Sequence, residues 1–464
     1  MMPIERAEKV HWDLETDVVV VGAGGCGMVA ALAAAQAGAQ VLLVEKTARI
    51  SGSTSLSTSM IPAAGTRFQK QAGIDDTPEI MARDILTKNK HTSDEAMTRC
   101  LCAHSAELVE WLGDYAGIKL HLPTDFLYSG HTRHRMHTTD HRTGAELVEQ
   151  LTAAVRRTPG IELVFNAPIR SLVADESGGV EGVVVETEQL ERVKARKTIL
   201  ATSGFGANKE MVARYCPDIA GALYFGGEGN TGEGILLGLE MGAAVENMDA
   251  YQGHGSVAFP HGMLVTWVVL VNGGFMVNKE GRRFGDEMLG YSGFAVYVNR
   301  QTDSVGFDIY DERIHKSVMP FADYQDCINA QAMKHADTME GLADALHLPA
   351  AALCKTLEDY HVAVDRGRDE FGRMELARLT PPYYGIQVTG ALFHTQGGLK
   401  VDARARVLRP DGSAIPNLYA GGGTAVGVSG RGANGYLAGN GLLAALVLGK
   451  LAGDDAGRAC KNQM

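Results

Sequence analysis

The sequence predicts an α/β fold in which one domain is interrupted by the insertion of a second, α+β domain. Three observations lead to this prediction. A strand–turn–helix–strand pattern occupies residues 17–46, a strand followed by a glycine-rich turn and a helix returns at residues 417–453, and the segment between them mixes aromatic strand sequence with a helical stretch. We therefore expect a discontinuous first domain at 1–248 and 396–464, and an inserted second domain at 249–395.

Composition excludes several classes of protein. Hydrophobic residues make up 45% of the 464 residues and charged residues 21%, which is typical of a globular chain. The net charge of −12, without a basic arm, argues against nucleic-acid binding. Seven cysteines without a C-x-x-C spacing predict neither a disulfide framework, nor a structural zinc site, nor attached c-type haem, and we expect no metal.

The sequence also argues against a membrane protein. Its first residues lack the apolar core of a signal peptide. The most apolar run, near 264–277, is interrupted by Thr266, Asn272 and two glycines, and it is too short to span a bilayer. We therefore expect a cytoplasmic protein without a membrane span.

The pattern near the N-terminus is that of a dinucleotide-binding βαβ unit. Residues 17–22 read DVVVVG, and Gly22, Gly24 and Gly27 fit G-x-G-x-x-G at the start of an Ala-rich helix. The first two glycines would let the backbone approach a pyrophosphate at the amino end of the helix, and the third would let helix and strand pack closely. Glu45 closes the next strand and would accept hydrogen bonds from ribose hydroxyls. This pattern predicts a Rossmann-type domain.

Periodicity predicts the neighbouring elements. Residues 51–65 are rich in small side chains and form either a loop along the cofactor or a flexible linker. Helical periodicity covers 78–117 and 143–157, and 161–187 alternates as strands broken by a turn. Residues 197–206 read as a strand that enters a glycine turn.

Further motifs follow the βαβ unit in a fixed order: SGST at 51–54, ILATSGFGANKE at 199–210, GNTGEGILLGLEMGA at 229–243, VNKEGRRFGDE at 277–287, FHTQGGLKVD at 393–402, and IPNLYAGG and GYLAGNG near the C-terminus. With these motifs the chain resembles, over nearly its whole length, the flavoprotein family of soluble fumarate reductases, succinate dehydrogenase flavin subunits and ketosteroid dehydrogenases. The resemblance implies a Rossmann-type FAD-binding domain and an α+β capping domain that closes over flavin and substrate. It also implies hydride transfer between flavin N5 and a substrate carbon next to an activated C–C bond.

Carried over position by position, the resemblance assigns the contacts of FAD. The implied set comprises Gly22, Gly24, Gly27 and Glu45 for the ADP half, and Ser51, Gly52, Ser53, Thr54, Gly204, Glu233, Gly422, Gly439, Asn440 and Leu442 for the pyrophosphate and flavin. Membrane-bound relatives attach FAD to a histidine in the region after the acidic strand. Residues 47–90 contain no histidine, so we expect non-covalent FAD.

The substrate site resembles that of a fumarate reductase in part. Three residues match its dicarboxylate clamp, namely His254 in MDAYQGH, Thr266 in GMLVT and His394 in FHTQGG. The proton relay does not match, because its glutamate falls on Trp267, which we interpret as a pocket wall, and its arginine falls on Leu270. These departures argue against fumarate reduction.

Two tyrosines point to a different reaction. The proton-donating arginine of the reductases falls on Tyr291, and the C-terminal carboxylate-binding arginine falls at Gly435–Tyr436, with Arg431 as the nearest cation. Ketosteroid dehydrogenases resemble this pattern, with one tyrosine as base and a second that hydrogen-bonds the ketone. Tyr291 would then remove the α-proton and Tyr436 would stabilise the developing enolate.

The implied activity is the FAD-dependent desaturation of a saturated ketone. A small cyclic keto acid such as 4-oxocyclohexanecarboxylate would use both the histidine clamp and the tyrosine pair. A 3-oxosteroid dehydrogenase, a fumarate-reductase-like reductase of an enoate, and a flavin-storing or flavin-sensing protein are the alternatives. The partners expected are a small-molecule substrate and an electron acceptor that is oxygen, a quinone or another protein.

A cluster of histidines and arginines lies at residues 131–142, in the sequence HTRHRMHTTDHR. It forms either a solvated basic surface loop or the border of a substrate mouth that attracts an anion. The spacing of its histidines is compatible with a metal site, but flavin chemistry requires none.

Overall fold

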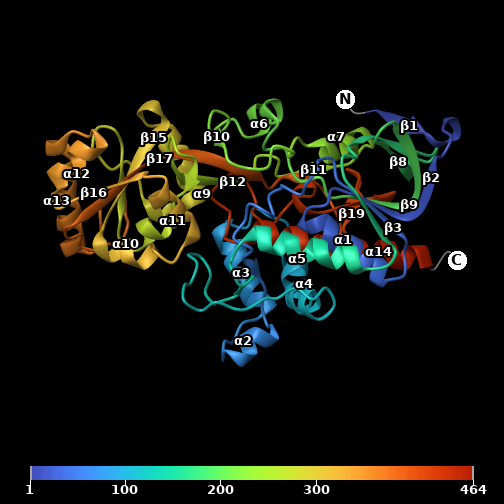
Figure 1. Cartoon of the computed structure of the whole chain (residues 1–464), viewed down its shortest axis with the longest axis horizontal. Helices are drawn as coiled ribbons and strands as arrows, with labels where there is room; N and C mark the ends of the chain where they lie inside the picture. Colours follow the sequence, from blue (N-terminus) through green and yellow to red (C-terminus); the bar gives the residue numbers. More distant parts are fainter. Residues whose placement is uncertain (1–2, 462–464) are drawn as a thin grey trace. The chain divides into compact units, whose positions relative to one another are not determined.

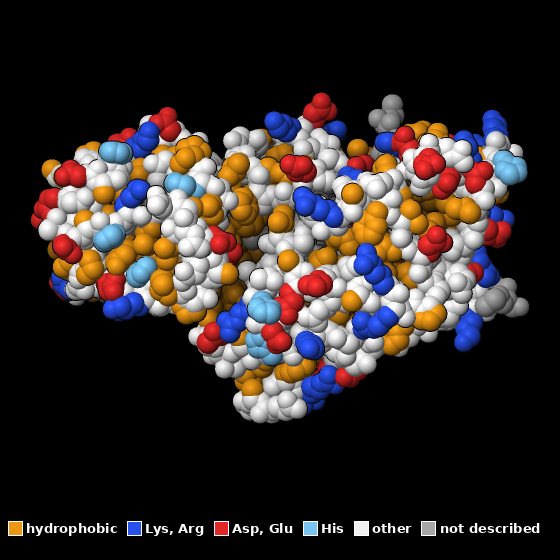
Figure 2. Space-filling view, in the orientation of Figure 1, with side chains coloured by type: hydrophobic (Ala, Val, Ile, Leu, Met, Phe, Trp, Pro, Cys, Tyr) orange, Lys and Arg blue, Asp and Glu red, His pale blue; other side chains and the backbone are white. Residues whose placement is uncertain are grey.

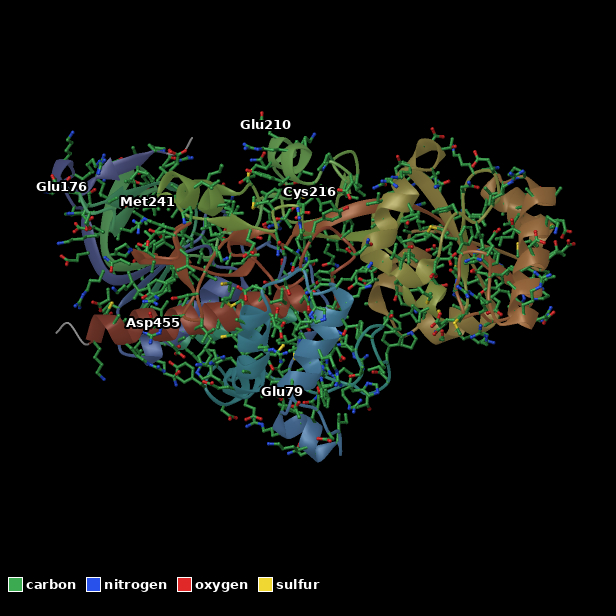
Figure 3. All side chains as sticks on the ribbon, turned by 180° about the vertical axis from the view of Figure 1, so that it is seen from behind. Glu79, Glu176, Glu210, Cys216, Met241 and Asp455 are labelled. Carbon is green, nitrogen blue, oxygen red and sulfur yellow. The ribbon has the colours of Figure 1, made fainter. Side chains whose placement is uncertain are left out.

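A computed structural model describes residues 3–461, and the chain divides into two compact units. The first unit, here called the βαβ unit, comprises Met1–Cys216, Gly226–Tyr251 and His394–Met464. The second, the inserted unit, comprises Pro217–Phe225 and Gln252–Phe393. Cys216, labelled in Figure 3, ends the first segment. The functional domains expected at 1–248 with 396–464 and at 249–395 stay a prediction.

Within residues 3–461, the βαβ unit is built on a nine-stranded sheet. Its strands follow the order β1-β7-β8-β9-β2-β3-β6, and β20 pairs with β9 and carries β19. The strands β2, β3, β6, β9 and β20 run parallel to their neighbours in this set. Val21 at the end of β2 lies opposite Val44 of β3 and Leu200 of β9. The carboxyl ends of these strands therefore meet at one edge, where a doubly wound fold binds its ligand.

The strands and helices of the βαβ unit have these bounds: β1 (Ile4–Arg6), β2 (Leu14–Val21), α1 (Gly25–Gln36), β3 (Val41–Val44), β4 (Ile61–Pro62), α2 (Arg67–Gln71), α3 (Pro78–Lys88), α4 (Glu95–Asp114), β5 (Met136–His137), α5 (Gly144–Arg157), β6 (Ile161–Val164), β7 (Ile169–Ala174), β8 (Val180–Glu186), β9 (Leu190–Leu200), α6 (Lys209–Tyr215), α7 (Glu233–Glu240), β11 (Val245–Glu246), β18 (Gly398–Leu399), β19 (Arg406–Leu408), β20 (Ala414–Ala420) and α14 (Asn440–Lys461).

Helices α1 and α14 lie side by side on one face of this sheet (Figure 1). Their approach depends on small residues. A Cβ added at Gly449 would come within 2.5 Å of the Cys26 carbonyl oxygen, and one added at Gly453 within 2.2 Å of the Ala30 carbonyl oxygen. The two glycines are one helical turn apart, so they form a groove along α14 into which the backbone of α1 fits.

The turn between β2 and α1 is equally tight. Gly22 has φ +100°, a conformation that favours glycine. A Cβ added at Gly27 would lie 1.8 Å from the Gly22 carbonyl oxygen, whereas one added at Gly24 would meet no atom within 4 Å. Gly27 therefore serves the packing of helix on strand, and Gly24 leaves open space at the amino end of α1.

Side-chain caps divide the predicted helical stretch at 78–117 into two helices. Thr77 accepts a hydrogen bond from the Ile80 backbone at 3.3 Å, and Asp94 accepts one from Met97 at 3.0 Å. Between them, Asn89 ends α3 and holds the C-terminal glycine-rich loop, because its amide donates to the Val428 carbonyl at 2.8 Å. Caps of this kind stabilise a helix start by about 0.5–2 kcal/mol each.

The inserted unit is built on a mostly antiparallel sheet with the order β13-β12-β17-β15-β14, in which β10 and β16 also pair with β17. Its elements are β10 (Leu223–Tyr224), β12 (Tyr251–Ala258), β13 (Met263–Leu264), α8 (Val268–Val271), β14 (Phe275–Val277), α9 (Tyr291–Asn299), β15 (Val305–Asp311), α10 (Glu312–Val318), α11 (Ala322–Asn329), β16 (Met333–Ala336), α12 (Met339–Leu346), α13 (Ala350–Arg366) and β17 (Tyr383–Thr395). The long strands β12 and β17 carry the chain into and out of this unit.

A buried ion network joins several segments of the inserted unit. Glu287, fully buried, accepts hydrogen bonds from Arg283 at 2.6 Å and Arg373 at 2.9 Å. Arg283 also pairs with Asp369 at 2.6 Å, and Glu287 accepts the backbone N–H of Met276 at 3.0 Å. Each buried charge is therefore paired and hydrogen-bonded, as its burial requires.

No helix within residues 3–461 is long and apolar enough to cross a membrane. On the face shown in Figure 2, Lys and Arg side chains are interspersed with Asp and Glu.

Replacement of Glu287 by glutamine should destabilise the inserted unit by about 3–5 kcal/mol, because it leaves the Arg283 and Arg373 charges buried beside a neutral group. Urea unfolding followed by intrinsic fluorescence measures the change. Glu280→Gln, a substitution at an exposed position seven residues earlier, should cost less than about 0.5 kcal/mol. Equal urea midpoints of unfolding for the two variants would show that the ion network does not stabilise the inserted unit.

The glycine turn provides a second, paired prediction. Gly24→Ala should leave the fold intact but weaken binding of the expected FAD, because its methyl group occupies open space at the amino end of α1. Gly27→Ala should instead destabilise the fold by about 1–3 kcal/mol or more through the clash with Gly22. FAD released by acid precipitation and the unfolding midpoint are the two measurements. A Gly24→Ala protein with full flavin content would show that the pyrophosphate does not bind at this turn.

Candidate functional site

Glu45 and Lys46 follow β3 directly at the carboxyl edge of the sheet. Glu45 Oε2 accepts the Ala23 backbone N–H at 3.0 Å, and Oε1 accepts the Thr47 backbone N–H at 3.1 Å. A carboxylate has about four acceptor sites, so Glu45 retains capacity for ribose hydroxyls. Lys46 forms an ion pair with Glu233 at 2.6 Å.

Three buried side-chain oxygens of the βαβ unit have no hydrogen-bond partner among the described residues: the Thr198 hydroxyl and two oxygens that can only accept, Oε2 of Glu233 and Oδ1 of Asn440. Glu233 begins α7 and Asn440 begins α14. Buried acceptors are normally satisfied, so each oxygen has an unused capacity that a bound group can fill. With the open space at Gly24 and a similar space at Gly52, these residues fit an FAD at the positions that the sequence assigns.

The other expected FAD contacts lie around this edge. Thr54 Oγ1 accepts the Gly25 backbone N–H at 3.2 Å, and Ser53 Oγ accepts the Asn230 amide at 3.0 Å. These bonds tie the loop at 51–54 to α1 and to the segment before α7. Ser51 is exposed and Leu442, in the first turn of α14, is buried.

Three of the expected glycines have packing reasons of their own. A Cβ at Gly204 would lie 2.1 Å from Thr395 Oγ1, and one at Gly439, which has φ +83°, would lie 2.7 Å from Pro62. Gly422, with φ +62°, lies against Cys26. Their roles as cofactor contacts stay a prediction.

In the inserted unit, His254 lies at the centre of an aromatic cluster. Its ring stacks between Tyr291, at a centroid distance of 5.1 Å, and Phe393, at 5.3 Å. Trp267 meets the His254 ring edge-on at 5.8 Å. The structure therefore brings together three of the residues expected in the substrate site, His254, Trp267 and Tyr291, and adds Phe393, which the sequence analysis missed although it directly precedes His394.

Burial fixes the state of His254. The ring is buried, and desolvation lowers the pKa of His254 to about 3. The backbone N–H of Ser256 donates to Nδ1 at 3.1 Å. A neutral imidazole with Nδ1 as acceptor carries its proton on Nε2, so His254 offers an N–H donor and no charge.

Local contacts position the other expected residues of the inserted unit: Thr266, Trp267 and Tyr291. The indole N–H of Trp267 donates to the Glu287 carbonyl oxygen at 3.3 Å, which ties it to the ion network. Thr266 is buried directly before it. Tyr291 is the first residue of α9 and follows Gly290, whose φ of +95° turns the chain. The last residue of the RRFGDE motif thus supports Trp267, and the turn at Gly290 starts the helix that carries Tyr291.

A second group of expected residues lies in the βαβ unit. His394 and Tyr436 meet edge-on with centroids 5.6 Å apart. Burial raises the pKa of Tyr436, and a hydrogen bond from the Gly441 backbone opposes part of this rise, so its phenol stays protonated. Desolvation lowers the pKa of His394 to about 4. Both groups are therefore neutral hydrogen-bonding groups near pH 7.

Arg431 lies in a different setting. Its side chain is 68% exposed and pairs with Asp249 at 3.2 Å. An exposed, paired guanidinium is a weak basis for a substrate clamp, since surface pairs are heavily screened. The assignment of Arg431 to substrate stays a prediction.

The structure corrects one interpretation of the 131–142 cluster. Arg135 is fully buried and pairs with Asp76 at 2.9 Å and Asp84 at 2.7 Å. His131 and His137 are buried, and desolvation lowers both pKa values to about 4. The idea of a solvated basic loop is wrong for these three residues: two aspartates neutralise Arg135, and the two histidines are buried, with His131 hydrogen-bonded to the Ala438 carbonyl and His137 to the Thr66 hydroxyl. Contact with substrate stays a prediction.

Sequence reasoning missed the residues that hold the site residues in place. Lys46 directly follows Glu45, and Gln396, whose amide contacts His394, lies within FHTQGG, so both were open to notice. Ser429, which hydrogen-bonds Gln396, and Arg373, which pairs with Glu287, lie outside the quoted motifs, and both contacts join residues far apart in sequence.

The comparisons with known proteins agree on the type of protein. The family model described as "FAD binding domain" matches residues 17–442. A cytochrome-type fumarate reductase of Shewanella frigidimarina is 33% identical over 453 residues, covering 96% of this chain and 77% of the relative. A urocanate reductase of Eggerthella lenta is 30% identical over 88% of this chain and 69% of its own length.

Solved structures extend the comparison. The open conformation of a flavocytochrome c3 fumarate reductase superposes with a TM-score of 0.83 and 30% identity, covering 97% of this chain and 79% of that chain. A 3-ketosteroid-Δ4-(5α)-dehydrogenase from Rhodococcus jostii, in complex with 4-androstene-3,17-dione, gives a TM-score of 0.77 and 26% identity over 98% of this chain and all of that chain. The predicted FAD cofactor, α/β flavoprotein fold and family are confirmed. The chain belongs to the FAD binding domain family and is an FAD-dependent oxidoreductase of the fumarate reductase and ketosteroid dehydrogenase type, acting on carbon–carbon bonds.

Proposed function

We propose that the protein desaturates a saturated ketone, with a small cyclic keto acid such as 4-oxocyclohexanecarboxylate as the best candidate substrate. The observation that carries the proposal is the setting of Tyr291. Tyr291 occupies the position of the proton-donating arginine in the reductase motif, and its ring stacks on His254. Bound FAD supplies the hydride acceptor that such a reaction requires.

The nearby arginines do not replace the missing acid. Arg283 is held by Glu287 and Asp369, and Arg373 is held by Glu287 and by the Leu270 carbonyl at 2.6 Å. Both guanidinium groups are saturated with buried acceptors, and arginine does not readily give up a proton in any case. This supports Tyr291 as the group that exchanges a proton with the α-carbon.

Tyr436 suits the complementary role. A carbon acid next to a ketone loses its proton more easily when a donor stabilises the oxygen of the developing enolate. The raised pKa of Tyr436 keeps its hydroxyl protonated and able to donate. His254, Thr266 and His394 would hold the carboxylate through neutral donors.

The aromatic surroundings favour a ring-shaped substrate. Phe393 also packs against Phe225 at 5.1 Å, so the cluster around His254 presents apolar surface on several sides. This observation also suits a 3-oxosteroid, which is the second candidate. An enoate reductase is the third candidate, supported by the identity to fumarate and urocanate reductases. Two anaerobic assays discriminate between the candidates. Bleaching of the oxidised flavin by a cyclic ketone, keto acid or steroid identifies a desaturase and its substrate class, whereas reoxidation of the reduced flavin by an enoate identifies a reductase.

The tyrosine roles predict two slow variants. Tyr291→Phe should keep FAD and bind ligand, but lose about 10²–10⁴-fold in the rate of flavin reduction, the usual contribution of a general base. Tyr436→Phe should also slow reduction, through the loss of enolate stabilisation. Stopped-flow absorbance under anaerobic conditions measures both rates.

Tyr297→Phe is the matched control, because Tyr297 lies on the same helix and is 40% exposed. It should reduce its flavin at the wild-type rate. A Tyr291→Phe variant that also reduces at that rate would place the base elsewhere, with Tyr128 or a histidine of 131–141 next to be tested.

Substrate charge provides a separate prediction. A cyclic keto acid should bind roughly tenfold to a hundredfold more tightly than the matching uncharged ketone, because a hydrogen bond to a charged group contributes about 1.5–3 kcal/mol. Equilibrium titration of the flavin absorbance measures both affinities. Equal affinities would favour the steroid.

The pH dependence of that affinity has a definite sign. A histidine with an ordinary pKa would lose its charge as pH rises through ~6.5 and would then bind the anion less tightly. The pKa values of His254 and His394, about 3 and about 4, mean that both rings are already neutral there. The affinity for the keto acid should therefore stay flat from pH 5.5 to 8, and a marked fall across this range would contradict neutral donors.

A further inference from the structure

A chain of side-chain hydrogen bonds runs from the start of α14 to His394. Asn440 Nδ2 lies 3.2 Å from Ser429 Oγ, Ser429 Oγ lies 2.8 Å from Gln396 Oε1, and Gln396 Nε2 lies 3.0 Å from His394 Nδ1. Asn440 and Ser429 are fully buried and Gln396 is 6% exposed. All four residues belong to the βαβ unit.

The backbone holds Gln396 in place for this contact. Its N–H donates to the Ala250 carbonyl at 2.8 Å, and its carbonyl accepts the Gly427 N–H at 2.8 Å. A Cβ added at Gly441 would lie 3.1 Å from His394 Cε1 and 3.6 Å from Gln396 Nε2, so the first turn of α14 closes over the pair. The amide therefore has little freedom to leave the imidazole.

The direction of the chain follows from its buried end. With Asn440 as donor, the Ser429 hydroxyl accepts that bond and donates its own O–H to Gln396 Oε1, and the Gln396 amide donates to Nδ1 of His394. The opposite direction reverses both amides and turns the NH₂ group of Asn440 to the place of its oxygen, which has no hydrogen-bond partner among the described residues. It also points a protonated Nδ1 of His394 at the Thr395 carbonyl oxygen, but that contact is 3.5 Å long, at the limit of a hydrogen bond, and weaker than the 3.0 Å contact with the Gln396 amide. Orphaned buried N–H groups are rarer than under-satisfied carbonyl oxygens. The forward direction is therefore the more stable one.

We infer that Gln396 is a positioning residue that holds His394 as the tautomer with its proton on Nε2, so that His394 acts as a hydrogen-bond donor. One part of the inference rests on the proposed function, namely that the Nε2–H group of His394 donates to an oxygen of the substrate. His254 reaches the same tautomer by another route, since a backbone N–H occupies its Nδ1. Both histidines of the expected clamp are thus fixed as Nε2–H donors, one by the main chain and the other by a side-chain amide.

Gln396 and its neighbours also link this donor to the cofactor side of the unit. Asn440 Oδ1, at the far end of these hydrogen bonds, is a buried acceptor that has no partner among residues 3–461. A donor that occupies this oxygen would reinforce the same direction, because it would hold the Asn440 amide with its NH₂ group toward Ser429. The chain therefore lets the FAD side of the unit support the tautomer of a substrate-binding histidine.

The test is the protonation of the two ring nitrogens in the holoprotein labelled with nitrogen-15 histidine. Long-range proton–nitrogen correlation spectra distinguish an acceptor nitrogen from an N–H nitrogen, and the His394 signals are identified by their loss in His394→Asn. We expect wild-type His394 to have a bare Nδ1 and a protonated Nε2 from pH 6 to 8. A protonated Nδ1 in the wild type would overturn the inference.

Two variants test the role of Gln396 itself. Gln396→Glu places an acceptor opposite Nδ1 and should move a proton onto that nitrogen, whereas Gln396→Met removes the donor and should give a mixture of tautomers. Gln387→Glu, on β17 at a partly exposed position nine residues before Gln396, should leave the His394 spectrum unchanged. Unchanged His394 signals in both Gln396 variants would overturn the positioning role, even if wild-type His394 has the expected tautomer.

The tautomer can be read without any substrate, so it is independent of the proposed reaction. If Nδ1 is bare but keto acids neither bind nor bleach the flavin, the proposed function fails and the positioning role stands. If keto acids bleach the flavin but Nδ1 is protonated, the positioning role fails and the proposed function stands.

Discussion

The buried carboxylate of Glu287 is the interaction on which the inserted unit depends. It joins Arg283 from its own turn, Arg373 from the segment after α13 and the backbone of β14. Ion pairs of this kind add little net stability relative to an apolar core, because desolvation offsets most of the attraction. Their effect is geometric. An unpaired charge in this interior is so costly that the three segments must meet in one arrangement, and that arrangement places Trp267 and Tyr291 beside His254.

The βαβ unit obtains its geometry in a different way, through the absence of side chains. Gly27 lets α1 touch β2, and Gly449 and Gly453 let α14 lie against α1. Both helices then begin at defined places, α1 at the glycine turn and α14 at Asn440. Helix amino ends carry partial positive charge and unpaired N–H groups, which suits a pyrophosphate and a reduced flavin. Close packing of small residues therefore determines where these two amino ends lie.

The difference between the two units explains what the sequence could predict. The βαβ motif is local: strand, turn, helix and strand follow one another within about 30 residues, so β2, α1 and β3 were open to prediction from spacing alone. Tyr291 was assigned in another way, through the resemblance of VNKEGRRFGDE to a motif of the reductase family. The charge partners of Arg135 and Arg373 are more than 50 residues away in sequence, and no local pattern near either arginine predicts them. Hence the 131–142 cluster was expected on either a solvated surface or a substrate mouth, whereas Arg135 lies in the interior.

Three residues that the sequence assigns to substrate, one in the inserted unit and two in the βαβ unit, share one property: they are uncharged. Desolvation keeps His254 and His394 neutral and Tyr436 protonated, and the nearby arginines are saturated by carboxylates. A reductase that protonates carbon from a cation needs a relay to restore that cation. A site of neutral donors needs no such relay when the proton is exchanged with a phenol and the charge that develops on a ketone oxygen is met by fixed hydrogen bonds. Replacement of the relay positions by Trp267 and Leu270 is therefore consistent with the rest of the site. Once the proton-exchanging group is a tyrosine, apolar walls that exclude water strengthen the remaining hydrogen bonds.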